Sequence, residues 1–427
     1  MINKKINKLL SSILGIMLSF GIMEMRALAD DSVEATSSYN TNVNLTENKS
    51  YIVNKDSSIE KNGLKITIDK IVATKHKLKA TVIVENEKSF DESELNNAIA
   101  QLTYGDNKCD SEGVSYEHPD EKTLRITLER NTGDEELPEK GELRIDIVLP
   151  NYKVNVGLNA YVDFSQSFKN TIEKDISAKI PEFGITLNKL ESNIMGTRII
   201  YSQPARDYSK RVENDFSNLP YSAIILKVGD KMFKTISAGG YSSADKDRLE
   251  FGSYEAECAT YEKVKDQKNI SIIPMVCNMN WNDTRKIYDD NKKNGYNEKR
   301  EANKETINNV SYIKSFDFSD GSKGEIYNIE RKDNTIKVYC KGTSDKESLL
   351  MASNMFMYYN LGDDKLGYNN IYDSRSNMSF YKDSKDAIGY IVEFNNVDKD
   401  KTVELDFEGM IKQIDKFKVG DEIQISK

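Results

Sequence analysis

The chain has 427 residues, long enough for two to four domains of ordinary size. Its 60 basic and 69 acidic residues give a formal net charge of −9, so we do not expect it to bind nucleic acid or another polyanion through its overall field. The 23 Tyr and 15 Phe residues exclude a wholly disordered chain, because disorder accompanies a scarcity of aromatic residues.

The N-terminal segment has the layout of a secretory signal peptide, which we assign to residues 1–29. An apolar run of about 15 residues, Leu9–Met23, is followed by the small-x-small sequence Ala27-Leu28-Ala29, with cleavage expected before Asp30. The positive charges that precede the run are Lys4, Lys5 and Lys8. We therefore expect an extracellular or cell-surface protein.

An uncleaved membrane anchor is the alternative for the same segment. A spanning helix needs roughly 20 apolar residues, and Glu24 and Arg26 interrupt this run too early. In either case the remaining chain is expected outside the membrane. Residues 30–57 are rich in Ser, Thr, Asn and charged residues without periodicity, which predicts a flexible linker.

Residues 58–167 are predicted to form the first domain, an immunoglobulin-like β-sandwich. Between Gly63 and Glu85, two runs of alternating apolar and polar residues predict an antiparallel hairpin. Similar runs at Leu124–Glu129 and Leu143–Leu149 contribute to six or seven short strands, with a barrel as the open alternative. We predict one short helix, at Phe90–Leu102.

The hairpin pattern recurs at Gly184–Tyr201 and at Gly324–Tyr339. The hairpin patterns begin at Gly63, Gly184 and Gly324, so more than about 100 residues separate one from the next. This interval is typical of domains and is too long for a solenoid repeat. We therefore predict a second β-sandwich at residues 168–305 and a third β domain at 306–427, separated by the charged segment Asn282–Thr306. The expected fold class is all-β, with tandem immunoglobulin-like β-sandwich domains.

A dense run of Met, Phe and Tyr at Leu349–Tyr359 is predicted to be a buried strand. Its methionine cluster could instead be an adaptable binding surface, because methionine side chains repack easily. That cluster comprises Met351, Met355, Phe356 and Met357. Trp281, the sole tryptophan, is predicted to anchor a core.

The chain has four cysteines, too few for a disulfide scaffold of this size: Cys109, Cys258, Cys277 and Cys340. Cys277 and Cys340 lie in apolar, strand-like runs where a thiol packs as a small hydrophobic group. A disulfide between Cys258 and Cys277 remains open, since sequence does not give their separation.

Little in the sequence indicates catalysis. The two histidines, His76 and His118, lie in polar, turn-like surroundings and are predicted to be surface residues. Neither zinc-ligand spacing nor a phosphate-binding loop is found, and the acidic clusters Asp289–Asn291 and Asp398–Asp400 are predicted to be solvated turns rather than calcium sites. We predict no catalytic residues, cofactor or metal; a wall-polymer hydrolase with paired carboxylates is the weaker alternative.

Two stretches resemble known but uncharacterised domains. Residues 62–74, NGLKITIDKIVAT, resemble the start of an extracytoplasmic domain of low-GC Gram-positive bacteria. Pro181–Leu190, together with Gly196–Ile199, is similar to a second domain of unknown function that follows it. Together these stretches reach from about Ser58 into the second predicted domain, and the resemblance rests on strand patterns.

This family often occurs on membrane proteins associated with extracytoplasmic-function sigma factors. The resemblance implies an immunoglobulin-like, non-enzymatic protein with an envelope-stress or surface-sensing role, and it carries over no functional residues. Only about eight residues precede the apolar run, too few for a cytoplasmic sigma-factor-binding domain. We therefore expect an exported binding or structural module of the cell envelope with an unknown protein or envelope partner, and a membrane-anchored sensor as the alternative.

Overall fold

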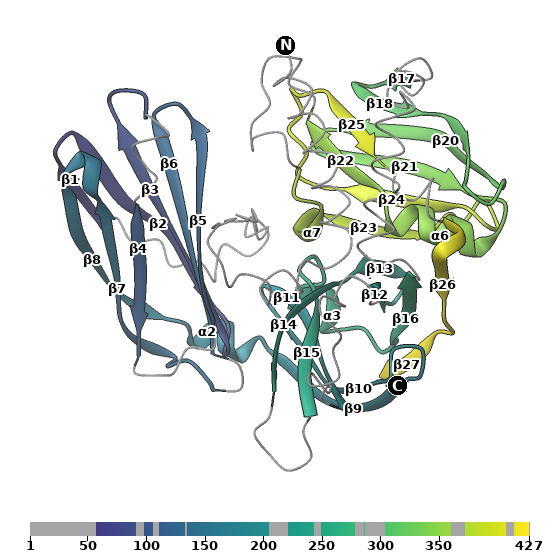
Figure 1. The fold of residues 1–427 in the computed structure, drawn as a ribbon, viewed down its shortest axis with the longest axis horizontal. Helices are drawn as coiled ribbons and strands as arrows, with labels where there is room; N and C mark the ends of the chain where they lie inside the picture. Colours follow the sequence, from purple (N-terminus) through teal and green to yellow (C-terminus); the bar gives the residue numbers. More distant parts are fainter. Residues whose placement is uncertain are drawn as a thin grey trace. The chain divides into compact units, whose positions relative to one another are not determined.

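The computed structural model describes residues 57–90, 98–105, 111–132, 135–204, 221–242, 249–277, 286, 304–359, 372–406 and 414–426. Nearly all of the predicted signal peptide and linker, along with Cys109 and Trp281, lies outside these ranges. The described residues fall into two compact units, which are considered separately below (Figure 1). The N-terminal unit contains residues 57–172 and 193–195, and the C-terminal unit contains 173–192 and everything after 195.

The described part of the N-terminal unit forms two antiparallel sheets, with strand orders β1-β2-β3-β6-β5 and β4-β7-β8. Leaving β1 aside, this is the A-B-E-D and C-F-G order of a constant-type immunoglobulin sandwich. The strands are β1 (Ser58–Lys61), β2 (Leu64–Ala73), β3 (Lys77–Asn86), β4 (Ile99–Tyr104), β5 (Ser111–Asp120), β6 (Thr123–Asn131), β7 (Lys140–Leu149) and β8 (Val154–Asp163), followed by the short helix α2 (Ser165–Lys169).

The core of this unit lies between the two sheets and follows from the period-two pattern. Alternate residues of β2, beginning Leu64, Ile66 and Ile68, are fully buried, and β3, β6, β7 and β8 contribute to the same cluster. The predicted hairpin at Gly63–Glu85 is confirmed as β2 paired with β3.

The helix predicted at Phe90–Leu102 is wrong over its second half. Ile99–Tyr104 is strand β4, paired with β7. Its buried residues alternate with exposed ones, Ala100 and Leu102 pointing inward while Ile99 is 60% exposed, which is the period of a strand rather than of a helix. Residues 91–97 lie outside the described ranges.

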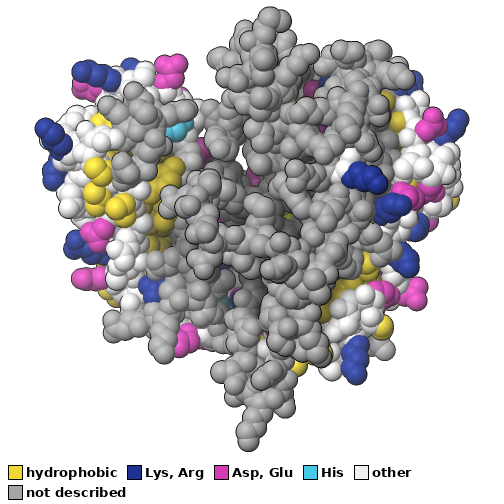
Figure 2. All heavy atoms as spheres, viewed as in Figure 1, with side chains coloured by type: hydrophobic (Ala, Val, Ile, Leu, Met, Phe, Trp, Pro, Cys, Tyr) yellow, Lys and Arg dark blue, Asp and Glu magenta, His cyan; other side chains and the backbone are white. Residues whose placement is uncertain are grey.

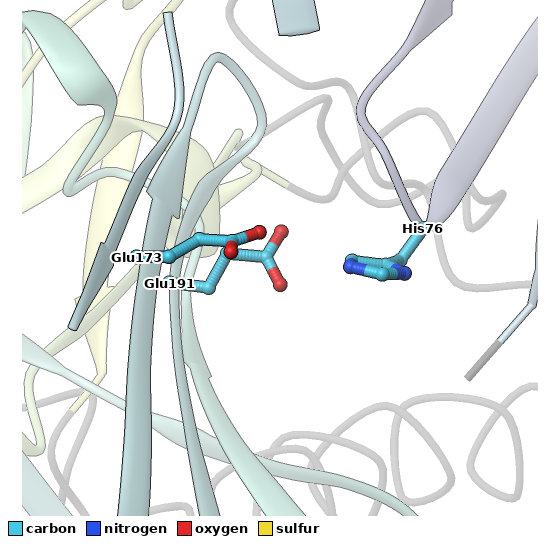
Figure 3. Close-up of side chains that lie close together, drawn as sticks. All are labelled: His76, Glu173 and Glu191. Atoms are coloured by element: carbon cyan, nitrogen blue, oxygen red, sulfur yellow. The ribbon is translucent and has the colours of Figure 1, made fainter. Parts of the chain in front are cut away.

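The C-terminal unit is built from three sheets in its described residues. The first, with order β14-β15-β11-β10-β9, contains β9 (Ile172–Ile180), β10 (Ile185–Asn193), β11 (Gly196–Pro204), β14 (Ile236–Ser242) and β15 (Leu249–Ala256). Figure 3 shows Glu173 of β9 and Glu191 of β10 on these neighbouring strands; His76, drawn in the same view, belongs to the N-terminal unit. Glu173 is ion-paired with Lys189 at 3.3 Å.

The second sheet, called here the long sheet, runs in the order β19-β20-β21-β24-β23-β13-β12-β16-β26, with β27 also paired to β16. Its strands are β12 (Tyr221–Val228), β13 (Lys231–Lys234), β16 (Ile270–Cys277), β19 (Ser315–Asp317), β20 (Lys323–Lys332), β21 (Thr335–Lys341), β23 (Met378–Lys382), β24 (Tyr390–Phe394), β26 (Phe417–Val419) and β27 (Ile423–Ser426). The third, four-stranded sheet contains β17 (Lys304–Ile307), β18 (Val310–Ile313), β22 (Phe356–Tyr359) and β25 (Val403–Asp406).

The all-β fold class is confirmed, but the strands do not separate at the boundary predicted near residue 305. Met232 of β13 pairs with Phe380 of β23, and β16 pairs with β26 and β27, so one sheet joins strands from both sides of that boundary. The predicted tandem of separate immunoglobulin-like domains is therefore not confirmed.

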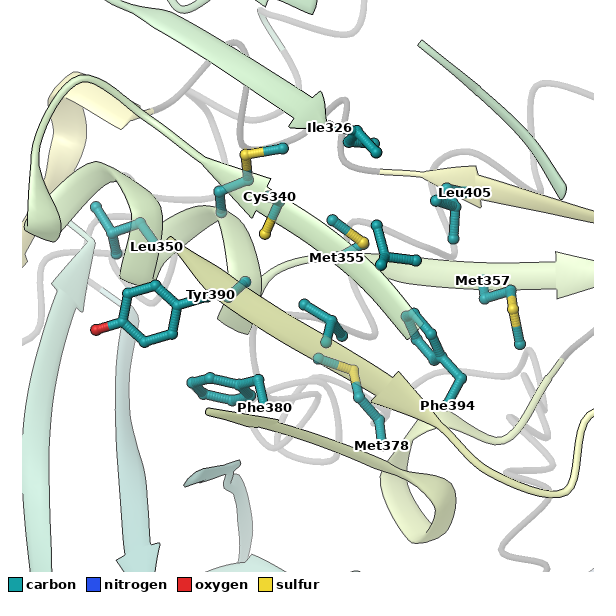
Figure 4. Packing of buried hydrophobic residues seen from close by; sticks show 14 of the residues in the cluster. Ile326, Cys340, Leu350, Met355, Met357, Met378, Phe380, Tyr390, Phe394 and Leu405 are labelled. Atoms are coloured by element: carbon teal, nitrogen blue, oxygen red, sulfur yellow. The ribbon is translucent and has the colours of Figure 1, made fainter. Parts of the chain in front are cut away.

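The main core of the C-terminal unit lies on one side of the long sheet (Figure 4). The long sheet contributes residues such as Cys340, Phe380 and Phe394 to this core. The four-stranded sheet contributes Met357 and Leu405 to the same core. Met351, Met355 and Met357 are buried in this cluster, so the methionine run is core and not an exposed binding surface.

The predicted strand over Leu349–Tyr359 is a strand only in its last part. Asp345–Ser353 is helix α6, and β22 begins at Phe356. The helix begins with a capping box, in which the Ser344 side chain accepts from the Glu347 amide and the Glu347 side chain accepts from the Ser344 amide. The other short helices of this unit are α3 (Tyr261–Val264) and α7 (Ser374–Asn377). Among the described helices, none has both the length and the apolar character needed to cross a membrane.

Candidate functional site

The long sheet has its main core on one side, and its other side is covered over β12 and β13. Leu226 and Phe233 point to this second side and are almost fully buried. Lys263 of α3 lies 6.0 Å from the centre of the Phe233 ring, and β14 and β15 contact β12. The part of this side formed by β20, β21, β24 and β23 carries tyrosine and charged side chains.

Three tyrosines and an isoleucine lie in a row across these four strands. Ile391 of β24 pairs directly with Tyr339 of β21 on one side and with Tyr381 of β23 on the other. Tyr327 of β20 extends the row, with its ring centre 6.0 Å from that of Tyr339. Ile391 is only 8% exposed, whereas the three tyrosines are partly exposed. We call this row, together with the charged residues beside it, the tyrosine face. These charged residues are Lys231, Glu330, Lys337, Lys341, Asp383, Asp386 and Glu393.

A β-bulge places Tyr327 in the row. The pairing of β20 with β21 shifts between Ile326 and Asn328, so that Tyr327 is the extra residue. Ile326 and Ile329 remain in the core, and the two residues between them, Tyr327 and Asn328, are partly or fully exposed. Bulges commonly redirect side chains in this way next to functional sites.

Charged residues along one edge of the row are held by ion pairs. Glu393 of β24 is ion-paired with Lys231 at 3.1 Å and with Lys337 at 3.7 Å. The Tyr381 hydroxyl donates to Glu393 at 3.4 Å, and Lys231 lies 5.8 Å from the Tyr381 ring centre. Burial favours the protonated acid, but the two lysines outweigh it and lower the pKa of Glu393.

The other edge is formed by the loop that joins β23 and β24. The Tyr327 hydroxyl donates to Asp383 at 2.7 Å, and Lys341 is ion-paired with Asp386 at 2.9 Å. Lys341 also lies 5.0 Å from the centre of the Tyr327 ring. Gly389 leaves room for this hydroxyl, because a Cβ at this position would lie 2.5 Å from the Tyr327 hydroxyl oxygen.

The tyrosines of the face remain neutral hydroxyl groups. Burial raises the pKa of Tyr339 to about 12, with a further contribution from its hydrogen bond to Glu330. Burial also raises the pKa values of Tyr327 and Tyr381, aided by Asp383 and Glu393 respectively. The face is open to solvent at its lysines: the side chains of Lys231 and Lys337 are 46% and 37% exposed.

On the coloured parts of the surface in Figure 2, basic and acidic side chains are interspersed rather than gathered into a patch of one sign. The tyrosine face shows the same balance, with Glu330, Asp383, Asp386 and Glu393 beside Lys231, Lys337 and Lys341. It therefore offers hydrogen-bond donors and acceptors together, with little net charge.

The structure places the two histidines in the N-terminal unit. His76 lies in the turn between β2 and β3 and is 8% exposed, so its predicted surface position is wrong. Its Nδ1 is 3.1 Å from the Glu135 carbonyl oxygen, and its own carbonyl accepts from the Thr132 amide at 2.9 Å. His118 of β5 is partly buried, with its ring 5.8 Å from that of Phe90.

Cys258, Cys277 and Cys340 are buried thiols, and no disulfide joins Cys258 to Cys277. Burial raises the pKa of Cys340 far above its usual value, which makes this thiol a poor nucleophile. Lys263 donates to the Cys258 carbonyl at 2.9 Å and lies 3.4 Å from its sulfur.

Of the two acidic turns, Asp398–Asp400 is described and Asp289–Asn291 lies outside the described residues. Asp398 accepts from the Asp400 amide at 3.0 Å, and its own amide donates to the Tyr359 hydroxyl at 3.1 Å. This cluster is accordingly a hydrogen-bonded turn.

Tyr327, Tyr339 and Tyr381 are not among the residues that the sequence patterns predicted to be functional. A local signal was present at residues 335–341, TIKVYCK, where period-two alternation puts Lys337 and Tyr339 on the face opposite the core residues. The alignment of Tyr339 with Tyr381 depends on the pairing of both strands with β24, which follows β21 in the chain only after α6, β22, α7 and β23.

No protein-family model matches the chain, and no curated protein matches it. Solved structures that are similar to it include one from Bacillus anthracis, described as "The crystal structure of the conserved domain protein". That structure is 16% identical with a TM-score of 0.39, and the match covers 60% of this chain and 86% of the other. A likeness at this level supports no conclusion about function.

Proposed function

We propose that this protein is an exported, non-enzymatic binding module of a Gram-positive cell envelope, and that its ligand binds on the tyrosine face. The observation that carries the proposal is the cross-strand row Tyr339–Ile391–Tyr381, bordered by ion-paired side chains on a sheet whose other side is core. The export part rests on the apolar segment Leu9–Met23 and the Ala27–Ala29 cleavage sequence. The resemblance of residues 62–74 supports the envelope assignment.

The arrangement suits recognition because its side chains are already fixed. Tyrosine combines a large apolar ring with a polar end and loses little conformational entropy on binding, so it is enriched in binding surfaces. Here the hydroxyls of Tyr327 and Tyr381 are held by Asp383 and Glu393. A ligand therefore meets a preorganised surface on rigid strands, which reduces the entropic cost of association.

The same contacts support binding over hydrolysis. A glycosidase needs one carboxyl group with a raised pKa to act as a general acid. Ion pairing with Lys341 lowers the pKa of Asp386, and Lys231 and Lys337 lower that of Glu393. Both carboxylates are thus stabilised in their ionised form, as acceptors rather than proton donors.

The test is co-sedimentation of the chain starting at Asp30 with envelopes isolated from a Gram-positive bacterium. We expect the wild-type protein to sediment saturably, and the double variant Tyr339→Ala/Tyr381→Ala to lose at least about tenfold in affinity, as for the loss of two interface anchors. Tyr161→Ala is the matched control, because Tyr161 is 59% exposed and lies in the N-terminal unit.

Thermal unfolding of each variant verifies that the protein still folds. If the folded double variant sediments like the wild type, the tyrosine face is not the binding surface and the proposal fails. If the wild-type protein does not sediment at all, the assignment of the protein to the cell envelope also fails.

A further inference from the structure

We propose that the ligand of the tyrosine face is a neutral, β-linked glycan chain that lies across the strands, along the row of tyrosines. This inference rests on the proposed function and adds the chemical class and the direction of the ligand. Three features of the face carry it: the spacing of the row, the polarity of its two edges and its balance of charge.

The spacing of the row matches an extended glycan. Neighbouring strands lie about 4.8 Å apart, so Tyr339 and Tyr381, which are separated by β24, are about 10 Å apart along the row. This is close to the length of one disaccharide unit in an extended β-1,4-linked chain. Tyr327 lengthens the row by one strand, to about 14 Å, which gives room for about three sugar rings.

The chemistry of the row matches a sugar ring in the same way. A β-linked pyranose has an apolar face of C–H groups and a rim of hydroxyls. The C–H face packs against the partly exposed tyrosine rings on either side of the nearly buried Ile391. The rim then reaches polar groups on both sides, with Glu393 and Lys337 along one edge and Asp386 and Lys341 along the other.

The charge balance argues against the charged alternatives. A polyanion, such as a glycerol-phosphate polymer, is attracted by an excess of lysine and arginine, and a basic peptide by an excess of acid. On this face the three lysines are already ion-paired, Lys231 and Lys337 with Glu393 and Lys341 with Asp386. A neutral ligand that both donates and accepts hydrogen bonds does not have to break these pairs.

The test is a calorimetric titration of the chain starting at Asp30 with defined oligosaccharides. The probes are β-1,4-linked N-acetylglucosamine and glucose oligomers of one to six units, an α-1,4-linked glucose hexamer, and a poly(glycerol phosphate). We expect β-linked oligomers to bind, with affinity rising steeply up to about three units and then levelling off, as the row length requires. The affinity should fall at least tenfold in Tyr339→Ala/Tyr381→Ala and change less than twofold in Tyr161→Ala.

Salt dependence separates the neutral ligand from charged ones. Binding of a neutral glycan should change little between low and high ionic strength, because no net charge is screened. Preference for the α-linked hexamer, or salt-sensitive binding of poly(glycerol phosphate) alone, would overturn the inference. If no β-linked oligomer binds while envelope co-sedimentation still depends on Tyr339 and Tyr381, a protein or another envelope component is the ligand. In that case the glycan inference fails and the proposed function stands.

Discussion

Tyr339 and Tyr381 lie on either side of Ile391 in one cross-strand row, although 42 positions separate the two tyrosines in the sequence numbering. Both tyrosines face away from the core that Val338, Cys340 and Phe380 help to form. The row therefore exists only when β21, β24 and β23 are assembled in the long sheet.

Gly389→Ala is predicted to weaken ligand binding without unfolding the protein. The added Cβ would lie 2.5 Å from the Tyr327 hydroxyl oxygen and 2.9 Å from the Asp386 Cβ, so the Tyr327 side chain must move. Overpacking of this kind typically costs about 1–3 kcal/mol of stability. Urea unfolding and envelope co-sedimentation measure the two effects.

The matched control for this change is Gly113→Ala on β5, where an added Cβ has nothing within 4 Å. We expect its stability and its binding to stay close to wild type. Equal binding by Gly389→Ala and Gly113→Ala would show that the position of Tyr327 is unimportant for the ligand.

Lys234 is predicted to make the stability of the protein depend on pH in the alkaline range. Burial lowers its pKa to about 7, with a smaller opposing effect from Cys277, while Nζ donates to Asn354 at 2.7 Å and lies 5.4 Å from the Phe356 ring centre. Between this value and the unfolded value of 10.5, the unfolded chain holds a proton that the folded chain lacks. The free energy of unfolding should therefore rise with pH in this window, by up to about 1.4 kcal/mol per pH unit from this group.

Lys234→Met should flatten this rise, since the variant has no group to deprotonate there. Urea unfolding of wild type and variant at several pH values between about 7 and about 10 gives the two slopes. Lys65→Met is the control, because the Lys65 side chain is 50% exposed and its loss should leave the slope unchanged. Identical slopes for wild type and Lys234→Met would contradict the lowered pKa.

The capping box of α6 is predicted to contribute measurably to stability. Ser344→Ala removes the acceptor of the Glu347 amide and should lower the free energy of unfolding by about 1 kcal/mol. Ser344→Asp keeps a capping oxygen and should retain most of the stability. Chemical denaturation of the three proteins tests this, and an alanine variant as stable as the wild type would mean that the cap is dispensable.

The three described cysteines are predicted to resist alkylation in the folded protein. Cys258, Cys277 and Cys340 are 3%, 2% and 0% exposed, and a thiol must reach solvent as thiolate to react. Iodoacetamide labelling followed by peptide mass spectrometry should modify them in denaturant and leave them unmodified in buffer. Rapid labelling of Cys340 in buffer would show that this core opens locally.

Several elements could be predicted from sequence because their signal is local. The hairpins β2–β3, β10–β11 and β20–β21 follow from alternation on both sides of a turn, and the structure confirms them. The alternation in Ile99–Tyr104 was misassigned, and the capping sequence Ser344–Glu347 was not recognised. The helix predicted at Phe90–Leu102 therefore extended into a strand, and the strand predicted at Leu349–Tyr359 extended into a helix.

The arrangement of the long sheet could not be predicted because its pairings are non-local. The contact of Met232 with Phe380 joins residues on opposite sides of a charged segment that has the composition of a domain boundary. The tyrosine face depends on the same non-local pairings. It also depends on the bulge at Tyr327, which leaves both Tyr327 and Asn328 outside the core where strict alternation would turn one of the two inward. The hydrogen bonds of His76 with Thr132 and Glu135 are likewise non-local, because these residues lie more than fifty positions along the chain.

The most direct test of the account is hydroxyl-radical footprinting of the tyrosines in the chain starting at Asp30, with and without isolated Gram-positive envelopes. We predict that oxidation of Tyr327, Tyr339 and Tyr381 falls when envelopes are added, while oxidation of Tyr161, which is 59% exposed, stays the same. Protection of Tyr161 with no change at the three tyrosines of the long sheet would contradict the account, because the ligand would then bind elsewhere.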